Sequence, residues 1–233
     1  MQGSGKRFRL QLEAGPRRQY RLAQLDDYGS RSRRQFPHES IDLRLQARVS
    51  ARLIPGTWGF GVWNDAFGLN LGGTGSAFRL PALPNAAWFF HASGESYLSL
   101  RDDLPANGLM AQVFRSPVFA PDVVRALVTT PFSPRLARRI LRGVVWEDSR
   151  LVSIDPTAWH DYHLLWRPTE TIFEVDGASI LRTRLSPNGR AGFVLWIDNQ
   201  FAAFTPLGKV AFGTLSSDLP VWLETESLAV ART

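Results

Sequence analysis

The strongest constraint on the fold comes from residues 159–177, which read WHDYHLLWRPTETIFEVDG. Aromatic and branched apolar side chains recur at every second position in both halves of this stretch, the spacing of β-strands with one buried face. Pro168 separates the two halves, and the pair Asp176-Gly177 is a signal for a tight hairpin turn. The stretch therefore predicts two antiparallel strands that lead into a further hairpin, and it restricts the chain to folds rich in antiparallel sheet.

Segments with a similar pattern recur through most of the chain. Residues 41–50 alternate apolar and polar side chains over their full length, and residues 192–201 form another predicted strand. The 15 Pro and 19 Gly are spread between such segments, where they favour turns. Hydrophobic residues make up 44% of the 233 residues, enough to fill a core between two sheets. We therefore expect one all-β domain spanning residues 1–233, a β-sandwich of two antiparallel sheets.

Strand alternation gives way to helical spacing between residues 120 and 143, which we interpret as a short helical insertion. Ser133 suits the N-cap, Pro134 suits the first helical position, and Gly143 lies just beyond the predicted end. Four arginines share one face of this helix: Arg135, Arg138, Arg139 and Arg142. We expect this face to lie in water; the alternatives are contact with an anionic membrane surface or a lid over the end of a groove.

Charge and cysteine content narrow the classes of function. The net charge is +6, almost all of it from arginine, but no nucleic-acid-binding motif accompanies it, so a nucleic-acid partner is not expected. The absence of cysteine excludes disulfides and cysteine-based catalysis or metal binding. No segment reaches the roughly 18 apolar residues of a membrane span and no signal peptide is evident, so a cytoplasmic protein is the default expectation.

Four parts of the chain together resemble glycoside hydrolase family 16. They are residues 43–63 (LRLQARV followed by GTWGFGVW), 159–177, 192–200 (GFVLWIDNQ) and 222–228 (WLETESL). The resemblance implies a concanavalin A-like jelly roll, a sandwich of two antiparallel sheets, here with the helical insertion at about 120–143. It also implies a carbohydrate-active protein that holds its ligand in a concave groove.

The catalytic motif of that family is missing. Its enzymes carry E-x-D-x-x-E or E-x-D-x-E on the strand after the G-T-W segment, because retaining hydrolysis needs two carboxyl groups about 5 Å apart. The corresponding strand is expected near residues 84–91 (PNAAWFFH), where apolar side chains replace the carboxylates. The E-x-D spacing of Glu174 and Asp176 falls at a predicted hairpin turn, which explains the Asp by backbone geometry. We therefore expect saccharide binding without standard hydrolysis, and no residue inherits the catalytic roles.

Two predicted strands supply candidate ligand-binding residues. Period-2 spacing places Trp63 and Asp65 on one face of the first, and Trp196, Asp198 and Gln200 on one face of the second. If the two strands are neighbours, these faces converge on a groove with indole rings for stacking on sugars and polar groups for their hydroxyls. The alternative is a network of buried polar groups with structural Trp residues. A further hypothesis makes Asp65 and Asp198 a relocated acid–base pair, as in a glycosidase with moved carboxylates.

Other chemistries have less support. His160 and His163 point to opposite faces of a strand, so they cannot hold one metal ion, and neither a metal nor a cofactor is expected. A third functional hypothesis is the binding of an apolar or amphiphilic ligand at a membrane surface, with a groove lined by Trp88, Phe89, Phe90 and Trp196. The side chains that face the groove distinguish these hypotheses, since polar groups around exposed Trp favour sugar and a dry aromatic wall favours an apolar ligand.

Overall fold

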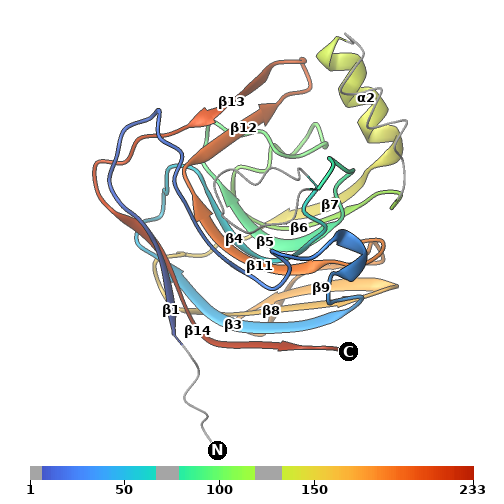
Figure 1. Ribbon diagram of the computed structural model, residues 1–233, viewed down its shortest axis with the longest axis horizontal. Helices are drawn as coiled ribbons and strands as arrows, with labels where there is room; N and C mark the ends of the chain where they lie inside the picture. Colours follow the sequence, from blue (N-terminus) through green and yellow to red (C-terminus); the bar gives the residue numbers. More distant parts are fainter. Residues whose placement is uncertain (1–6, 67–78, 119–132) are drawn as a thin grey trace, which may run out of the picture.

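Residues 7–66, 79–118 and 133–233 are described by a computed structural model of the protein. Within these ranges the strands form two six-stranded antiparallel sheets and a separate two-stranded ribbon. The two large sheets lie face to face, with the ribbon and helix α2 on one side of the sandwich (Figure 1). The predicted all-β sandwich with a short helical element is therefore confirmed.

The outer sheet consists, in spatial order, of β1 (Phe8–Leu12), β14 (Val221–Ala231), β3 (Ile41–Val49), β8 (His160–Arg167), β9 (Glu170–Val175) and β10 (Ala178–Thr183). The inner sheet consists of β2 (Leu22–Asp26), β11 (Gly192–Asp198), β4 (Thr57–Trp63), β5 (Ala86–Ala92), β6 (Gly108–Arg115) and β7 (Trp146–Leu151). The ribbon pairs β12 (Gln200–Phe204) with β13 (Val210–Thr214), and the helical elements are the 3-10 turn η1 (Arg33–Gln35) and α2 (Pro134–Val144). We call the face of the inner sheet that is turned away from the outer sheet the concave face.

Residues 159–177 form the strands that their spacing predicts. β8 and β9 pair antiparallel across the turn at Pro168, and β10 returns beside β9. Asp176 and Gly177 connect β9 to β10 with φ angles of 52° and 76°. Two successive residues with positive φ are the signature of a type I′ turn, which matches the twist of the flanking strands.

The main core fills the space between the two sheets. Phe89 of β5 lies near its centre and is fully buried. Its ring centroid lies 5.0 Å from that of Tyr162 and 5.2 Å from that of Phe173, both on the outer sheet. On its own sheet it lies 5.6 Å from Phe60. Aromatic packing across the interface thus joins the two sheets into one hydrophobic unit.

The alternation of apolar and polar residues predicts neither β6 nor β7. β7 begins at Trp146, two residues after α2 ends. In β6, Leu109 and Val113 face the main core while Met110 and Phe114 face the concave side, and all four are buried. A strand that is buried on both faces reads as a continuous apolar run and not as an alternation.

Helix α2 begins as predicted and ends later. The Ser133 side chain accepts a hydrogen bond at 3.3 Å from the backbone N–H three residues on, which confirms the N-cap. Gly143 lies within the last turn of Pro134–Val144 and not beyond the helix. No helix in the described ranges is long and apolar enough to cross a membrane. Residues 119–132, which hold the first part of the predicted insertion, lie outside the described residues.

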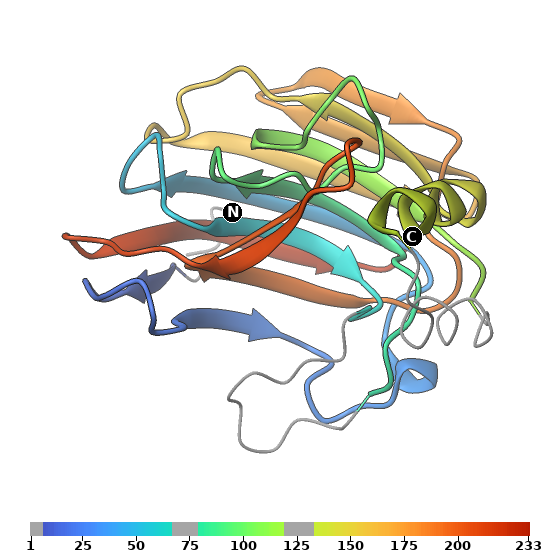
Figure 2. The same cartoon turned by 90° about the horizontal axis from the view of Figure 1, so that it is seen from above.

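One of the four arginines of α2 does not face water, contrary to expectation. Arg138 is only 3% exposed. Its guanidinium donates to the backbone carbonyls of Ser99, Arg101 and Phe204 at 2.6–3.0 Å and forms an ion pair with Asp102 at 3.1 Å. Arg138 therefore fastens α2 to the loop after β5 and to the β12–β13 ribbon, and Figure 2 shows the ribbon reaching across the sandwich toward the helix.

Candidate functional site

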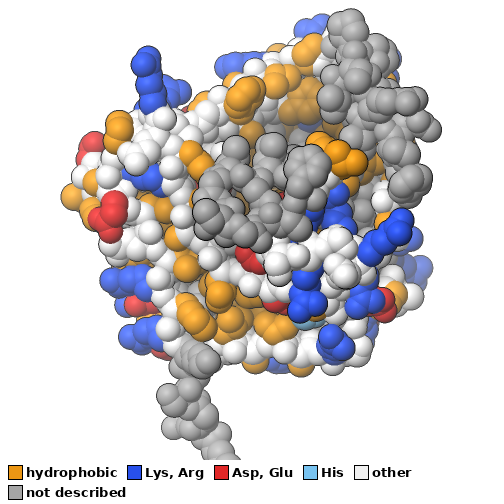
Figure 3. Space-filling view, in the orientation of Figure 1, with side chains coloured by type: hydrophobic (Ala, Val, Ile, Leu, Met, Phe, Trp, Pro, Cys, Tyr) orange, Lys and Arg blue, Asp and Glu red, His pale blue; other side chains and the backbone are white. Residues whose placement is uncertain are grey.

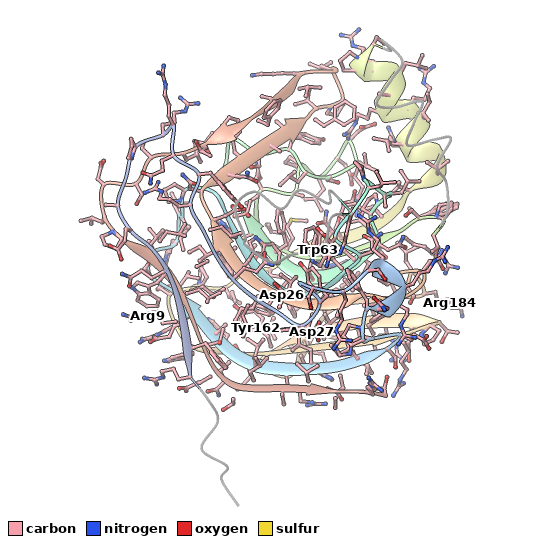
Figure 4. The ribbon with its side chains drawn as sticks, in the orientation of Figure 1. Arg9, Asp26, Asp27, Trp63, Tyr162 and Arg184 are labelled. Atoms are coloured by element: carbon pink, nitrogen blue, oxygen red, sulfur yellow. The ribbon has the colours of Figure 1, made fainter. Side chains whose placement is uncertain are left out.

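Four large rings meet on the concave face and form what we call the aromatic floor: Trp63, Trp88, Phe90 and Trp196. Trp88 is central, with ring centroids at 5.5 Å from Trp196, 5.6 Å from Phe90 and 5.9 Å from Trp63. Trp63 and Trp88 remain half-buried, whereas Phe90 and Trp196 are buried. Figure 4 shows Trp63 on the opposite side of the inner sheet from the core residue Tyr162. The pairing of β4 with β11, on which the convergence of their candidate residues depends, is also present.

Glycines in β4 make room for this floor. Gly59 and Gly61 occupy the concave side of the strand, opposite Trp196 and Trp88 of the neighbouring strands. A Cβ atom added at Gly59 would lie 2.7 Å from the Trp196 ring and would also collide with the Phe89 carbonyl oxygen. One added at Gly61 would lie 2.6 Å from the Trp88 Cα. The indoles can lie close to β4 only because these positions lack side chains.

We expect Gly59→Ala to lower the free energy of unfolding by about 1–3 kcal/mol, since the backbone carbonyl it meets belongs to a paired strand and cannot easily move. The same substitution should perturb the near-UV circular dichroism of the displaced Trp196. Gly94→Ala is the matched control, because a Cβ there meets nothing within 4 Å. Urea unfolding that gives equal stabilities for the two variants would contradict this account of the floor.

Asp198 holds the Trp196 ring through Thr57. The Trp196 indole N–H donates to the Thr57 hydroxyl at 3.0 Å, and that hydroxyl donates to Asp198 Oδ1 at 2.8 Å. The same carboxyl oxygen accepts the backbone N–H groups of Thr57 and Gln200 at 3.3 and 3.1 Å. Burial of Asp198 raises its pKa to about 6, against the opposing effect of these hydrogen bonds.

This raised pKa makes the stability depend on pH. The folded state binds the Asp198 proton more tightly than the unfolded chain, so the contribution is fully present below about pH 4 and is lost as pH rises through about 6. Burial lowers the pKa of His91 to about 4, which gives the opposite slope in the same window. Because His91 is present in both proteins, its contribution to the pH dependence cancels when the stability of Asp198→Asn is compared with that of the native protein.

We expect Asp198→Asn to gain about 2–3 kcal/mol relative to the native protein between pH 4 and pH 7, because the amide keeps the Oδ1 acceptor but cannot ionise. Urea unfolding measured across this range provides the test. A difference between the two proteins that stays constant with pH would show that Asp198 has no raised pKa.

Asp65 holds the other end of the floor in a similar way. Its carboxylate forms an ion pair at 2.7 Å with the buried Arg79, whose guanidinium also donates to the Tyr28 carbonyl at 2.7 Å and lies over the Tyr28 ring. The Tyr28 hydroxyl accepts the Trp63 indole N–H at 2.6 Å. Burial raises the pKa of Tyr28, so this hydroxyl stays neutral.

Asp65 and Asp198 do not form the acid–base pair considered from the sequence. Asp198 lies opposite Thr57 at the beginning of β4, and Asp65 follows Trp63 at its end. Six residues of extended strand span roughly 20 Å, far more than the ~5–9.5 Å between the carboxyl groups of glycosidases. The two acids are placed to position different tryptophans and not to act on one bond.

Two other expected groove residues lie elsewhere. The predicted strand 192–201 breaks at Asn199, whose side chain accepts the Arg21 N–H at 2.9 Å. Gln200 therefore opens the β12–β13 ribbon and does not extend the concave face beside Asp198. Phe89 points into the main core and cannot line a groove on the other side of β5.

The sequence did not reveal a polar network beside Trp88. The Trp88 indole N–H donates to Gln112 Oε1 at 3.0 Å, and the Gln112 amide donates to Glu147 Oε1 at 3.0 Å. Glu147 Oε1 also accepts the hydroxyls of Ser99 and Ser149 at 2.7 and 2.9 Å. Gln112 lies on β6 and Glu147 on β7, two strands that the alternation of apolar and polar residues does not predict. The signal for this network in the sequence was Gln112, the lone polar residue in the apolar run LMAQVF.

The two histidines of β8 have separate partners. His160 contacts Asp176 at 2.6 Å, whereas His163 bridges Asp42 at 3.1 Å and Glu174 at 2.8 Å. The described part of the chain contains no cluster of three or more His or acidic side chains that could hold a metal ion.

Comparisons with known proteins bear on the fold. No family model and no curated protein matches the sequence. Among solved structures, the κ-carrageenase from Pseudoalteromonas carrageenovora in complex with a κ-carrageenan oligotetrasaccharide is similar with a TM-score of 0.51 and 9% identity, over 98% of this chain and 83% of that one. The alginate lyase AlyC3 gives 0.49 and 9% over 97% and 74% of the chains, and a legume lectin-like domain from Entamoeba histolytica gives 0.44 and 10% over 99% and 90%.

The strand order and the likeness to the carrageenase define the class of the fold. The protein is a concanavalin A-like jelly-roll sandwich, as the resemblance in the sequence implied. At 9% identity the likeness carries the architecture alone. The function has to be argued from the concave face itself.

Proposed function

We propose that the protein binds a saccharide on the concave face, as a divergent relative of glycoside hydrolase family 16. The observation that carries the proposal is the half-buried pair Trp63 and Trp88, with ring centroids 5.9 Å apart at the centre of that face. Exposed indole rings stack on the apolar faces of pyranose rings. The half-buried Glu147 on one side and the exposed Gln24 on the other supply hydrogen-bonding groups for hydroxyls, while the buried Gln112 orients Glu147.

The candidate residues divide into two roles in this proposal. Trp63 and Trp88 provide the accessible ring surfaces, and the buried Trp196 packs against Trp88 and supports them. Asp65 and Asp198 are positioning residues, because Asp198 fixes the Trp196 indole through Thr57 and Asp65 fixes the Trp63 indole through Arg79 and Tyr28. Gln200 lies at the base of the ribbon, so in this proposal it contacts only a ligand that extends past Trp196 onto the ribbon.

We propose further that this binding occurs without the standard hydrolysis of the family. Strand β5 presents Ala86, Trp88, Phe90 and Ala92 to the concave face, so it offers no carboxyl group. Glu147 does face the aromatic floor, but both of its carboxylate oxygens already accept hydrogen bonds from the protein. A carboxylate held in this way supports ligand orientation better than proton transfer.

Screening on an array of neutral and anionic glycans, followed by calorimetric titration, tests the proposal. We expect saturable binding of at least one oligosaccharide. An array without any binder above background, from protein shown to be folded by circular dichroism, would exclude saccharide binding. Release of reducing ends from the bound glycan would instead overturn the non-hydrolytic part of the proposal.

An apolar or amphiphilic ligand at a membrane surface is the second candidate. It is favoured by the aliphatic side chains Leu98, Leu100, Leu141 and Val144, which pack against the same aromatic floor. Detergent or fatty-acid binding that excludes oligosaccharide would support this alternative. Co-sedimentation with anionic liposomes would have to depend on the exposed arginines of α2.

A further inference from the structure

A basic pocket lies at the junction of α2, the β12–β13 ribbon and the loop after β5. Its volume is about 260 Å³, and it is lined by Asp102, Arg135, Arg138, Arg139, Arg142 and Pro206. Among the described residues, Asp102 is the only acidic side chain in this lining, and it pairs with Arg138 and Arg142. The lining therefore carries a surplus of positive charge.

The helix that supplies these arginines is electrostatically unfavourable by itself. Arg135 with Arg139, and Arg138 with Arg142, are like-charge pairs spaced four residues apart. The first turn holds no acidic residue, although the positive end of the helix dipole lies there. Departures from local rules that the fold does not require are characteristic of functional sites.

The arginines differ in how many donors they have free. Arg138 donates four N–H groups to protein acceptors, so it is held in place at the base of the pocket. To residues in the described ranges, Arg135 donates only through its Nε, which bonds to the Leu207 carbonyl at 2.8 Å. Arg139 makes no hydrogen bond or ion pair to any residue within the described ranges and is exposed. Free guanidinium donors around a fixed positive charge suit an oxyanion, which can accept two of their hydrogen bonds at once.

The pocket is connected to the aromatic floor. The Ser99 carbonyl accepts from Arg138, while the Ser99 hydroxyl donates to Glu147, which in turn is bonded to Gln112 beneath Trp88. Leu141 on the same helix packs in the cluster that contains Trp88. The pocket and the floor therefore lie against the same loop and the same helix. On the face shown in Figure 3, basic side chains are more widespread than acidic ones, which favours an anionic substituent.

We infer that the basic pocket binds an oxyanion group, a sulfate, phosphate or carboxylate, that is carried by the saccharide. The inference rests on the proposed saccharide function and defines its substrate class as an anionic glycan. A pocket with a buried arginine at its base favours one discrete group over the flat charged surface of a membrane.

Calorimetric titration with a sulfated oligosaccharide and with the same oligosaccharide after chemical desulfation tests the inference. We expect the native protein to bind the sulfated form more tightly, and Arg139→Gln and the double variant Arg135→Gln/Arg139→Gln to lose roughly tenfold in affinity for it or more. Their affinity for the desulfated form should change less than about twofold. Arg18→Gln/Arg184→Gln removes the same charge from exposed arginines outside the pocket and should leave both affinities unchanged.

Each alternative result has a distinct reading. Equal binding of both forms by native protein overturns the pocket but leaves the proposed saccharide function standing, whereas binding of neither overturns both. Arginine-dependent binding to vesicles containing phosphatidylglycerol, without any preference for the sulfated oligosaccharide, assigns the arginines to a membrane and also overturns the inference.

Discussion

Trp88→Ala is expected to weaken saccharide binding by roughly 30-fold or more, equivalent to about 2 kcal/mol or more. Trp88 contacts every other ring of the floor, and its indole N–H fixes the Gln112 amide. Loss of this ring removes a stacking surface and also loosens the polar groups beside it. Calorimetric titration with the tightest oligosaccharide from the array measures the effect.

Trp222→Ala is the matched control for that experiment. Trp222 is also half-buried, but it lies on the outer sheet, where its ring packs under the guanidinium of Arg9 at 4.4 Å. Its removal should change the affinity less than about twofold, because saccharide stacking depends on the concave face. Equal losses of affinity in the two variants would mean either that both are unfolded or that the ligand does not bind on the concave face. Circular dichroism separates these two outcomes.

Phe89→Ala, one residue away on the same strand, is expected to act on stability instead. We expect it to lower the free energy of unfolding by about 3–5 kcal/mol, since it leaves a cavity among the rings of Phe60, Tyr162 and Phe173. Phe212→Ala on the ribbon is the control, because that ring is 82% exposed and should contribute within about 0.5 kcal/mol. Urea unfolding in which Phe89→Ala costs less than about 1 kcal/mol would contradict the central place of Phe89 in the core.

The neighbouring residues Trp88 and Phe89 also show why the fold was easier to predict than the site. In a strand with one polar and one apolar face, such as β3 or β8, the sequence shows which face is buried. Tight turns such as Asp176-Gly177 fix the connections between strands. In β5 both faces carry aromatic residues, so the sequence gives no sign which of the two rings faces the core. Only the packing of the outer sheet against Phe89 decides it.

The misplaced candidates have similar physical causes. Gln200 would continue the face of Asp198 on a longer strand, but Asn199 bonds to the backbone of a distant segment and ends β11. By helical spacing Arg138 belongs to the basic face of α2, but in the fold it donates to two carbonyl groups of the loop after β5 and to one at the end of β12. Such long-range hydrogen bonds leave no trace in local spacing.

The hydrogen-bond networks around Asp65 and Asp198 could not be predicted from the sequence either. Strand register was enough to place Trp63 and Trp196 on the concave face, and that part of the reasoning agrees with the structure. The partners of the two acids, Arg79 and Thr57, come from other segments of the chain. The period-2 spacing of the strands could place the two acids on the same face as the tryptophans. It could not distinguish a catalytic role from a positioning role.

The indole N–H resonances of the tryptophans provide the most direct test of saccharide binding on the concave face. The chain has 8 Trp residues, distributed over the concave face, the main core and the outer surface, so each region has its own reporter. On titration with a bound oligosaccharide, we predict chemical-shift changes at Trp63, Trp88 and Trp196 that saturate with one dissociation constant. The signals of Trp58 and Trp166 in the core, and of Trp159 and Trp222 on the outer sheet, should stay in place. Shifts confined to Trp159 and Trp222, with the concave-face signals unchanged, would contradict the account.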